Sequence, residues 1–363
     1  MNILLVGGLN VNPDRFLPII AAHNVYGIWE SAPNWNVSVK AGGPYVEIPT
    51  ITIADIPKKK IDVVWSLLSP WDGLKTTLVI RKKYPKLPII RQTQGACTPW
   101  WHTVVKTRPK KRQRGNYDFS KLKKVLEYST GLMFISEKYR QCLIDQGAAI
   151  QDIPYIISNG MAYNHDLISN NNTVKLRTAD KTPHIALIGR DRHKVNVLLK
   201  NKIHVHYHSL SPLQKHAYAH KEVYRGDARM IQNRPIHIKK IFDFKKKLWQ
   251  KTFSRYDAGL MHFFNPNGLD VFNGTDINVP GRVNTYIMHG LPPIISNKES
   301  AIQDFLKDTE CAIDFLVYGE LIEKLNNDMF IKERQRNTLE IRDKFSMQYE
   351  FNNNVLPFMR NFI

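Results

Sequence analysis

Three positive side chains follow the apolar run at residues 184–188 and its glycine, Gly189: Arg190, Arg192 and Lys194. The run predicts a buried strand, and parallel α/β sheets bind ligands at the carboxyl ends of their strands. Guanidinium and ammonium groups in that place can surround a diphosphate and neutralise it as it leaves. We therefore expect an anion site here, with a solvated basic turn as the alternative.

A second segment that could bind an anion covers residues 278–296. Its pattern predicts a loop, a helix over 283–289 with Gly281 and Arg282 at its start, a stop at Gly290 and a further strand. The start of a helix carries partial positive charge, and Arg282 would add to it. The segment is therefore a candidate for phosphate binding.

Two glycines, Gly7 and Gly8, come directly after the first apolar run of the chain. Without side chains, they would allow backbone N–H groups to approach a phosphate or a sugar closely. A tight turn that needs positive φ is the alternative. The pair therefore predicts either a ligand contact or a turn.

These segments need a scaffold, and the whole chain has the pattern of one. Short apolar runs alternate with amphipathic stretches, which is typical of parallel strands crossed by helices in an α/β fold. We expect strands over 2–6, 61–66, 89–92, 131–136, 155–158, 184–188, 204–208, 258–262, 293–296 and 312–315. We expect helices over 73–84, 117–128, 137–146, 243–253, 283–289 and 301–307 and from 318 onward.

The length of 363 residues leaves room for two substantial domains. A polar stretch from 164 to 181 separates two similar series of strands and helices, so we place the boundary there. The predicted domains are 1–165 and 166–344, each Rossmann-like, followed by a tail over 345–363.

Positive charge is in large excess, since 52 Lys and Arg against 32 Asp and Glu give a formal net charge of +20. Such a field favours polyanions, meaning nucleic acid, anionic lipid or phosphorylated small molecules. The densest part follows a tryptophan pair and suits an anionic membrane surface, with indoles at the interface and cations over the head groups. A solvated loop whose tryptophans pack inward is the alternative. The segment includes Trp100, Trp101, Lys110, Lys111 and Arg112.

Cysteine use and hydropathy point to a reducing compartment. Cys97, Cys142 and Cys311 lie far apart and do not have the spacing of a disulfide framework or a zinc knuckle. The N-terminus has the pattern of a buried strand and not of a signal peptide, and the apolar runs are too short to span a bilayer. We expect a cytoplasmic protein, with contact to the inner face of the membrane left open.

Several segments of the chain resemble those of a known family. The run from Pro280-Gly281-Arg282 through Tyr286 to Gly290-Leu291-Pro292 is similar to the nucleotide-sugar segment of GT-B glycosyltransferases of the group 1/family 4 type. Residues 61–65, 88–95, 131–140 and 157–161 resemble, in order, landmarks of the acceptor domain of that superfamily. The resemblance implies two Rossmann-like domains that face each other across a cleft, with a C-terminal helix that crosses back to the first domain.

The resemblance also implies an activity. The enzyme would transfer a sugar from a nucleotide-sugar donor to a hydroxyl of a glycan or lipid-linked acceptor, without a metal ion or cofactor, in the synthesis of cell-surface polysaccharide. Two features depart from relatives: the paired glutamates of many retaining members are missing from 265–286, and no D-x-D triplet occurs. The resemblance implies these donor-binding residues: Gly7, Gly8, Gly189, Arg190, Lys194, Arg282, Asn284 and Tyr286.

An inverting reaction needs a general base that faces the cleft from the first domain. Asp72 is the first candidate, followed by His102 and Glu30. An Asp before a glycine and a helical run is also an ordinary N-cap, and His102 could equally be a surface or packed histidine. The alternatives to the main function are a DNA-base glycosyltransferase of the same fold and a non-catalytic protein that binds nucleic acid or glycan.

Three histidines, His204, His206 and His208, alternate along one predicted strand. Imidazoles are common metal ligands, and alternation puts all three on one face. One strand alone rarely supplies a complete ligand set, and nearby His216 and His220 suit a polar surface, so we assign no metal site. His204 and His208 could instead lie within reach of a donor sugar.

Overall fold

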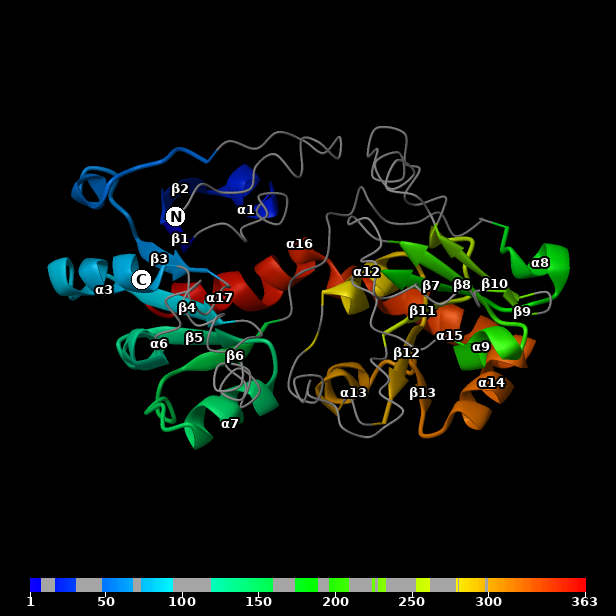
Figure 1. Ribbon diagram of the computed structural model, residues 1–363. Helices are drawn as coiled ribbons and strands as arrows, with labels where there is room; N and C mark the ends of the chain where they lie inside the picture. The colour runs from blue at the N-terminus through cyan, green and yellow to red at the C-terminus, as the bar shows by residue number, and fades with distance from the viewer. Residues whose placement is uncertain are drawn as a thin grey trace.

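The computed structural model describes residues 1–7, 17–30, 48–67, 73–93, 119–158, 174–188, 196–208, 224–225, 228–232, 253–261, 279, 281–297 and 300–363. These residues form two lobes, each built around its own sheet (Figure 1). The first half of the chain makes one lobe and most of the second half makes the other. Both termini lie in the first lobe.

The first sheet has six parallel strands in the spatial order β2-β1-β3-β4-β5-β6. Its central strands are buried, and their apolar residues suit a parallel sheet covered on both faces, although β4 also buries Arg91, Gln92 and Thr93. The strands are β1 (Asn2–Gly7), β2 (Asn24–Trp29), β3 (Val63–Ser66), β4 (Ile89–Thr93), β5 (Gly131–Phe134) and β6 (Tyr155–Ile157). The helices of this lobe are α1 (Leu17–Ala22), α3 (Leu74–Lys83), α6 (Phe119–Glu127) and α7 (Glu137–Asp145).

The second sheet has seven strands in the order β13-β12-β11-β7-β8-β10-β9. All neighbouring pairs are parallel except β9 and β10, which are antiparallel. The strands are β7 (His184–Ile188), β8 (His204–His208), β9 (Tyr224–Arg225), β10 (Ala228–Gln232), β11 (Ala258–Leu260), β12 (Pro293–Ser296) and β13 (Ile313–Phe315). The helices are α8 (Arg177–Asp180), α9 (Asn196–Lys200), α12 (Arg282–Met288), α13 (Ser300–Leu306), α14 (Tyr318–Asn326) and α15 (Asp328–Ile341).

The last residues of the chain return to the first lobe. They form α16 (Met347–Glu350), a π-helical turn (Phe351–Val355) and α17 (Leu356–Arg360). Buried apolar side chains of this tail, among them Phe351 and Phe358, pack with strand residues Ile3, Trp65 and Met133 of the first sheet. The predicted α/β class, the two Rossmann-like units and the returning C-terminal helix are thus all confirmed (Figure 1).

All ten predicted strands are present, whereas β2, β9 and β10 were not predicted. The β2 sequence, Asn-Val-Tyr-Gly-Ile-Trp, contains a glycine and polar residues, so it lacks the continuous apolar run of its neighbours. It pairs with β1 along six residues. The helix predicted over 243–253 lies outside the described residues, apart from its last residue.

Candidate functional site

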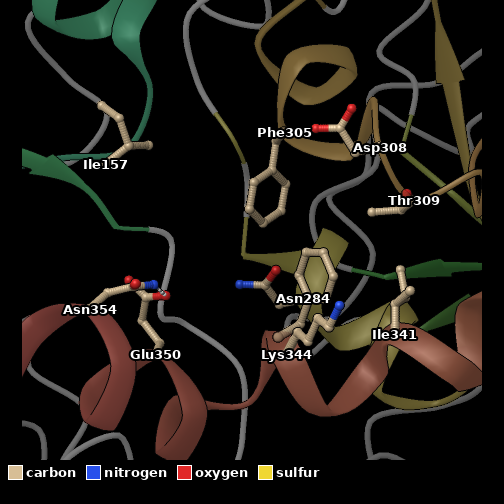
Figure 2. A pocket seen from close by; sticks show the side chains of 10 residues that line it. Ile157, Asn284, Phe305, Asp308, Thr309, Ile341, Lys344, Glu350 and Asn354 are labelled. Atoms are coloured by element: carbon tan, nitrogen blue, oxygen red, sulfur yellow. Dashed lines mark hydrogen bonds between the residues drawn. The ribbon is translucent and has the colours of Figure 1, made fainter.

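A pocket of about 380 Å³ lies between the two lobes, where the first sheet, the helices of the second lobe and the tail meet. Figure 2 shows Glu350 and Asn354 of the tail on one side and Asn284, Phe305 and Lys344 on the other. An ion pair of 3.1 Å between Lys138 and Asp304 joins α7 to α13 across the lobes. The pocket lining comprises Ile157, Asn284, Phe305, Asp308, Thr309, Ile341, Lys344, Phe345, Glu350 and Asn354.

Glu350 is a partly buried carboxyl group in this lining. Its Oε2 accepts a hydrogen bond of 2.6 Å from the Asn354 amide, one helical turn further along the tail. Its Oε1 is buried and has no hydrogen-bond partner among the described residues. Burial raises the pKa of Glu350, against the lowering effect of the Asn354 and Ser158 side chains. The group can therefore accept a hydrogen bond from a hydroxyl, and its raised pKa favours accepting a proton.

Asn284 comes from α12 and, among the predicted donor-binding residues that the structure describes, is the one that lines the pocket. It is buried, and its amide faces the same space as the exposed Lys344 (Figure 2). An amide can both donate to and accept from sugar hydroxyls, and an ammonium group can pair with a phosphate. The pocket thus offers groups for both parts of a nucleotide sugar.

Tyr286, a second predicted donor-binding residue, lies in the core of the second lobe. Its hydroxyl accepts the N–H of Ile188 at 2.9 Å and lies within hydrogen-bond distance of the carbonyls of Ala186 and Leu260. Burial raises the pKa of Tyr286 to about 12. The side chain therefore joins α12 to the ends of β7 and β11, and Arg282 lies half-buried one turn earlier.

The sheet topology singles out the ends of two strands. Strand order reverses at β1 in the first sheet and at β7 in the second, because successive strands are added on opposite sides of each. Ligands of open α/β sheets bind at the carboxyl ends of such strands. Gly7 ends β1, where it pairs with Trp29 as an ordinary strand residue, and Ile188 ends β7 just before Gly189 and Arg190.

Glu30, the third candidate base, has a different role in the structure. Its two carboxylate oxygens accept the N–H groups of Gly73 and Thr76 at 3.0 and 2.8 Å. It thereby caps α3, whose own N-cap residue, Gly73, has no side chain. The carboxylate is occupied by the helix, which is the function that sequence alone offered as the alternative for Asp72.

Other predicted site residues lie outside the described part of the chain and stay predictions. They are the bases Asp72 and His102, the donor residues Gly8, Gly189, Arg190 and Lys194, and the membrane segment with Trp100, Trp101, Lys110, Lys111 and Arg112. Within the described residues, no helix is long and apolar enough to cross a membrane.

No protein-family model and no curated protein matches the sequence. Solved structures match over nearly the whole chain. The α,α-trehalose 6-phosphate synthase of Burkholderia multivorans superposes with a TM-score of 0.57 at 9% identity and covers 99% of this chain and 98% of its own. An α-glucosyltransferase in complex with UDP-glucose and DNA that contains an abasic site gives a TM-score of 0.53 at 9% identity, with 98% of each chain covered.

The chain has the GT-B fold. A putative UDP-N-acetylglucosamine 2-epimerase of Listeria monocytogenes is also similar, with a TM-score of 0.52, 9% identity and coverage of 99% of this chain and 96% of its own. The fold expected from the GT-B resemblance is confirmed by these structures.

Glu350, Asn354 and Lys344 were not predicted as site residues. Their signal in the sequence is weak, because they lie in a stretch that predicts only a helical tail. Glu350 and Asn354 are four residues apart, next to the buried stripe of Met347, Phe351 and Val355. A polar pair beside an apolar stripe is usually a solvated helix edge, and only the return of the tail to the first lobe puts this pair into a pocket.

Proposed function

We propose that the protein is a glycosyltransferase that uses a nucleotide-sugar donor and a glycan or lipid-linked acceptor, without a metal ion, in the synthesis of cell-surface polysaccharide. The observation that carries the proposal is the pocket between the lobes of a GT-B fold, with Asn284, Lys344 and Glu350 in its lining. The similar α-glucosyltransferase is in complex with UDP-glucose, and the similar Listeria protein is a putative UDP-N-acetylglucosamine 2-epimerase, which favours a uridine diphosphate donor.

In the proposed reaction, an acceptor hydroxyl oxygen attacks the anomeric carbon and the bond from that carbon to the diphosphate breaks. The positive charges predicted at Arg190 and Lys194, after the carboxyl end of β7, stabilise the leaving diphosphate. In the inverting case, the hydroxyl proton passes to a base. Glu350 joins Asp72 and His102 as a candidate, because it lines the pocket and its pKa is raised.

The acceptor side of the proposal rests on the basic aromatic segment. Trp100 and Trp101 with the cations that follow would hold the enzyme at an anionic membrane, where a lipid-linked acceptor is found. Pelleting with vesicles tests this step. Binding to anionic vesicles should exceed binding to neutral ones and should be lost in Trp100→Ala/Trp101→Ala.

The donor site is tested by thermal melting of the full chain with UDP, GDP, CMP and dTDP, each with and without Mg²⁺. A ligand at one hundred times its Kd stabilises the native state by about 2.7 kcal/mol, which is readily measured. We expect one nucleotide to raise the Tm to the same extent with and without Mg²⁺. If no nucleotide raises the Tm and no donor is hydrolysed or transferred, the proposal is wrong.

A matched pair of variants locates the nucleotide. Lys344→Ala removes an exposed ammonium group of the pocket, and Lys332→Ala removes an equally exposed one on α15, outside the pocket lining. Only the first should reduce the nucleotide-dependent rise in Tm. Equal rises in both variants would show that the donor nucleotide does not bind at Lys344 in this pocket.

A DNA-base glycosyltransferase is the second candidate, and it is favoured by the net charge of +20. The α-glucosyltransferase with DNA in its crystal has the same fold. Duplex binding that weakens steeply as salt rises, together with sugar transfer to DNA, would support this candidate. Transfer to glycan or lipid-linked acceptors alone would exclude it.

A further inference from the structure

Three side chains converge at the amino-terminal edge of the second sheet, on the edge opposite the predicted diphosphate loop. His184 and His204 are the first residues of the neighbouring strands β7 and β8, and they lie opposite each other in the register. Their rings stack with centroids 4.5 Å apart and planes within 5°. Asp180 ends α8, four residues before His184.

The polar atoms of the three residues lie close enough together to reach one metal ion once the stacked histidine rings turn toward it. Asp180 Oδ2 lies 2.9 Å from His184 Nε2 and 3.7 Å from His204 Nε2, and one ligand atom of each residue lies within 4.8 Å of the others. Two ligands of a tetrahedral Zn²⁺, with bonds of about 2.0–2.1 Å, are roughly 3.3 Å apart. We propose that Asp180, His184 and His204 bind a divalent transition-metal ion of the zinc type.

A fourth residue, His206, orients the site. Its Nε2 lies 2.8 Å from His184 Nδ1, while His184 Nε2 lies 2.9 Å from the Asp180 carboxylate and donates to it in the metal-free chain. A metal ion at Nε2 would replace that proton, and His206 Nε2 would then accept the proton that Nδ1 carries. His206 is held in turn by Tyr256, whose ring centroid is 4.5 Å away. This arrangement is the outer hydrogen-bond shell found around metal-binding histidines, and His206 is a positioning residue.

Access is also provided, because the Asp180 side chain is 43% exposed whereas the two histidine ligands are buried. Water can therefore complete the coordination from the Asp180 side. The Asp180 carboxylate is held in place by the Thr182 N–H, which donates to Oδ1 at 3.0 Å and leaves Oδ2 toward the histidines.

The ion would have a structural role. It would fasten α8, at the start of the second lobe, to β7 and β8. The ligand set differs from the His204, His206 and His208 set that alternation along one strand offers, because it draws on three elements of the fold. The proposal does not depend on glycosyl transfer, and its test does not measure it.

The test uses the full chain, freed of metal with EDTA and then dialysed. Co²⁺ absorption, Zn²⁺ competition against a chelator and thermal melting with Zn²⁺ or Mg²⁺ are measured. We expect one Zn²⁺ or Co²⁺ per chain and a rise in Tm with Zn²⁺ only, since imidazole favours zinc over magnesium. Zn²⁺ affinity should fall at least about tenfold in Asp180→Ala and His204→Gln, and in His206→Gln by the loss typical of an outer-shell partner, about 10- to 100-fold.

Two control variants distinguish the ligand sets. His208→Gln, on the same strand, should keep wild-type affinity, as should His23→Gln in the first lobe. Asp180→Ala changes a half-exposed side chain, so it remains informative if His204→Gln does not fold. Absence of stoichiometric Zn²⁺ binding, or binding unchanged in Asp180→Ala, would overturn the proposal and leave a His–Asp hydrogen-bonded pair. Loss of binding in His208→Gln would do so as well.

Discussion

The hydroxyl of Tyr286 can be removed without changing the shape of the core, and the structure indicates how much the free energy of unfolding would fall. The β7–β11 ladder ends at the pair Gly259 and Ala186, and the hydroxyl takes over as the next partner of β7 by accepting the N–H of Ile188 at 2.9 Å. Tyr286 is fully buried, so water cannot replace it in Tyr286→Phe. The Ile188 N–H would lose this partner.

A buried N–H without a partner costs about 1–3 kcal/mol. We therefore expect the free energy of unfolding of the second lobe to fall by about 2 kcal/mol in Tyr286→Phe. For a lobe of this size, that corresponds to a Tm lower by roughly 4–8 °C. Far-UV circular dichroism in guanidinium and thermal scans measure both, and hydrogen exchange should show faster loss of the Ile188 amide proton.

Tyr349→Phe is the matched control, because Tyr349 is 38% exposed and a substitution at the surface usually changes the free energy of unfolding by less than about 0.5 kcal/mol. If Tyr286→Phe is also within about 0.5 kcal/mol of the wild type and the Ile188 amide exchanges at an unchanged rate, the hydroxyl does not hold the end of β7, and our reasoning fails. Because Gly189 and Arg190 follow Ile188, the variant should also reduce the rise in Tm caused by the donor nucleotide.

Three further changes test the packing and the pH dependence. A Cβ at Gly259 would clash with the Tyr286 ring, so Gly259→Ala should lower the free energy of unfolding in guanidinium by about 1–3 kcal/mol. The loss should be smaller in a Tyr286→Ala background, and equal losses in both backgrounds would exclude the clash. Phe358→Ala should cost about 3–5 kcal/mol and expose the tail to proteases, since the ring is buried against the first sheet; wild-type resistance would contradict this. Burial lowers the pKa of His289 to about 4, so between pH 6.5 and about 4 only the unfolded chain binds this proton, and stability falls as pH falls through this range. Between pH 7 and pH 5 the free energy of unfolding should fall by about 2 kcal/mol because of this group, and the fall should be smaller by that amount in His289→Asn. Urea unfolding at both pH values measures it, and equal falls in the two proteins would contradict the assignment.

The strands could be predicted because their signal is local. Runs such as His184–Ile188 and Pro293–Ser296 are mainly apolar, as strands covered on both faces are, and the structure has them with the predicted bounds. β2 was missed for the same reason. Its Tyr26 and Gly27 break the run, and it is a strand because β1 and residue Thr50 pair with it, which its own sequence does not indicate.

Residues of the candidate sites are harder to predict because they meet through the topology and not through spacing. Glu350 reaches the pocket only because Phe351 and Phe358 pack on the first sheet and bring the tail back across the lobes. His184 and His204 are 20 residues apart and meet because both begin strands that are adjacent in the sheet. Sequence periodicity ranks neighbours along one strand first, which is why it grouped His204 with His206 and His208. The register of a parallel sheet instead joins residues at equal depth in different strands, and the histidine cluster is a product of that long-range pairing, as the pocket is of the packing of the tail.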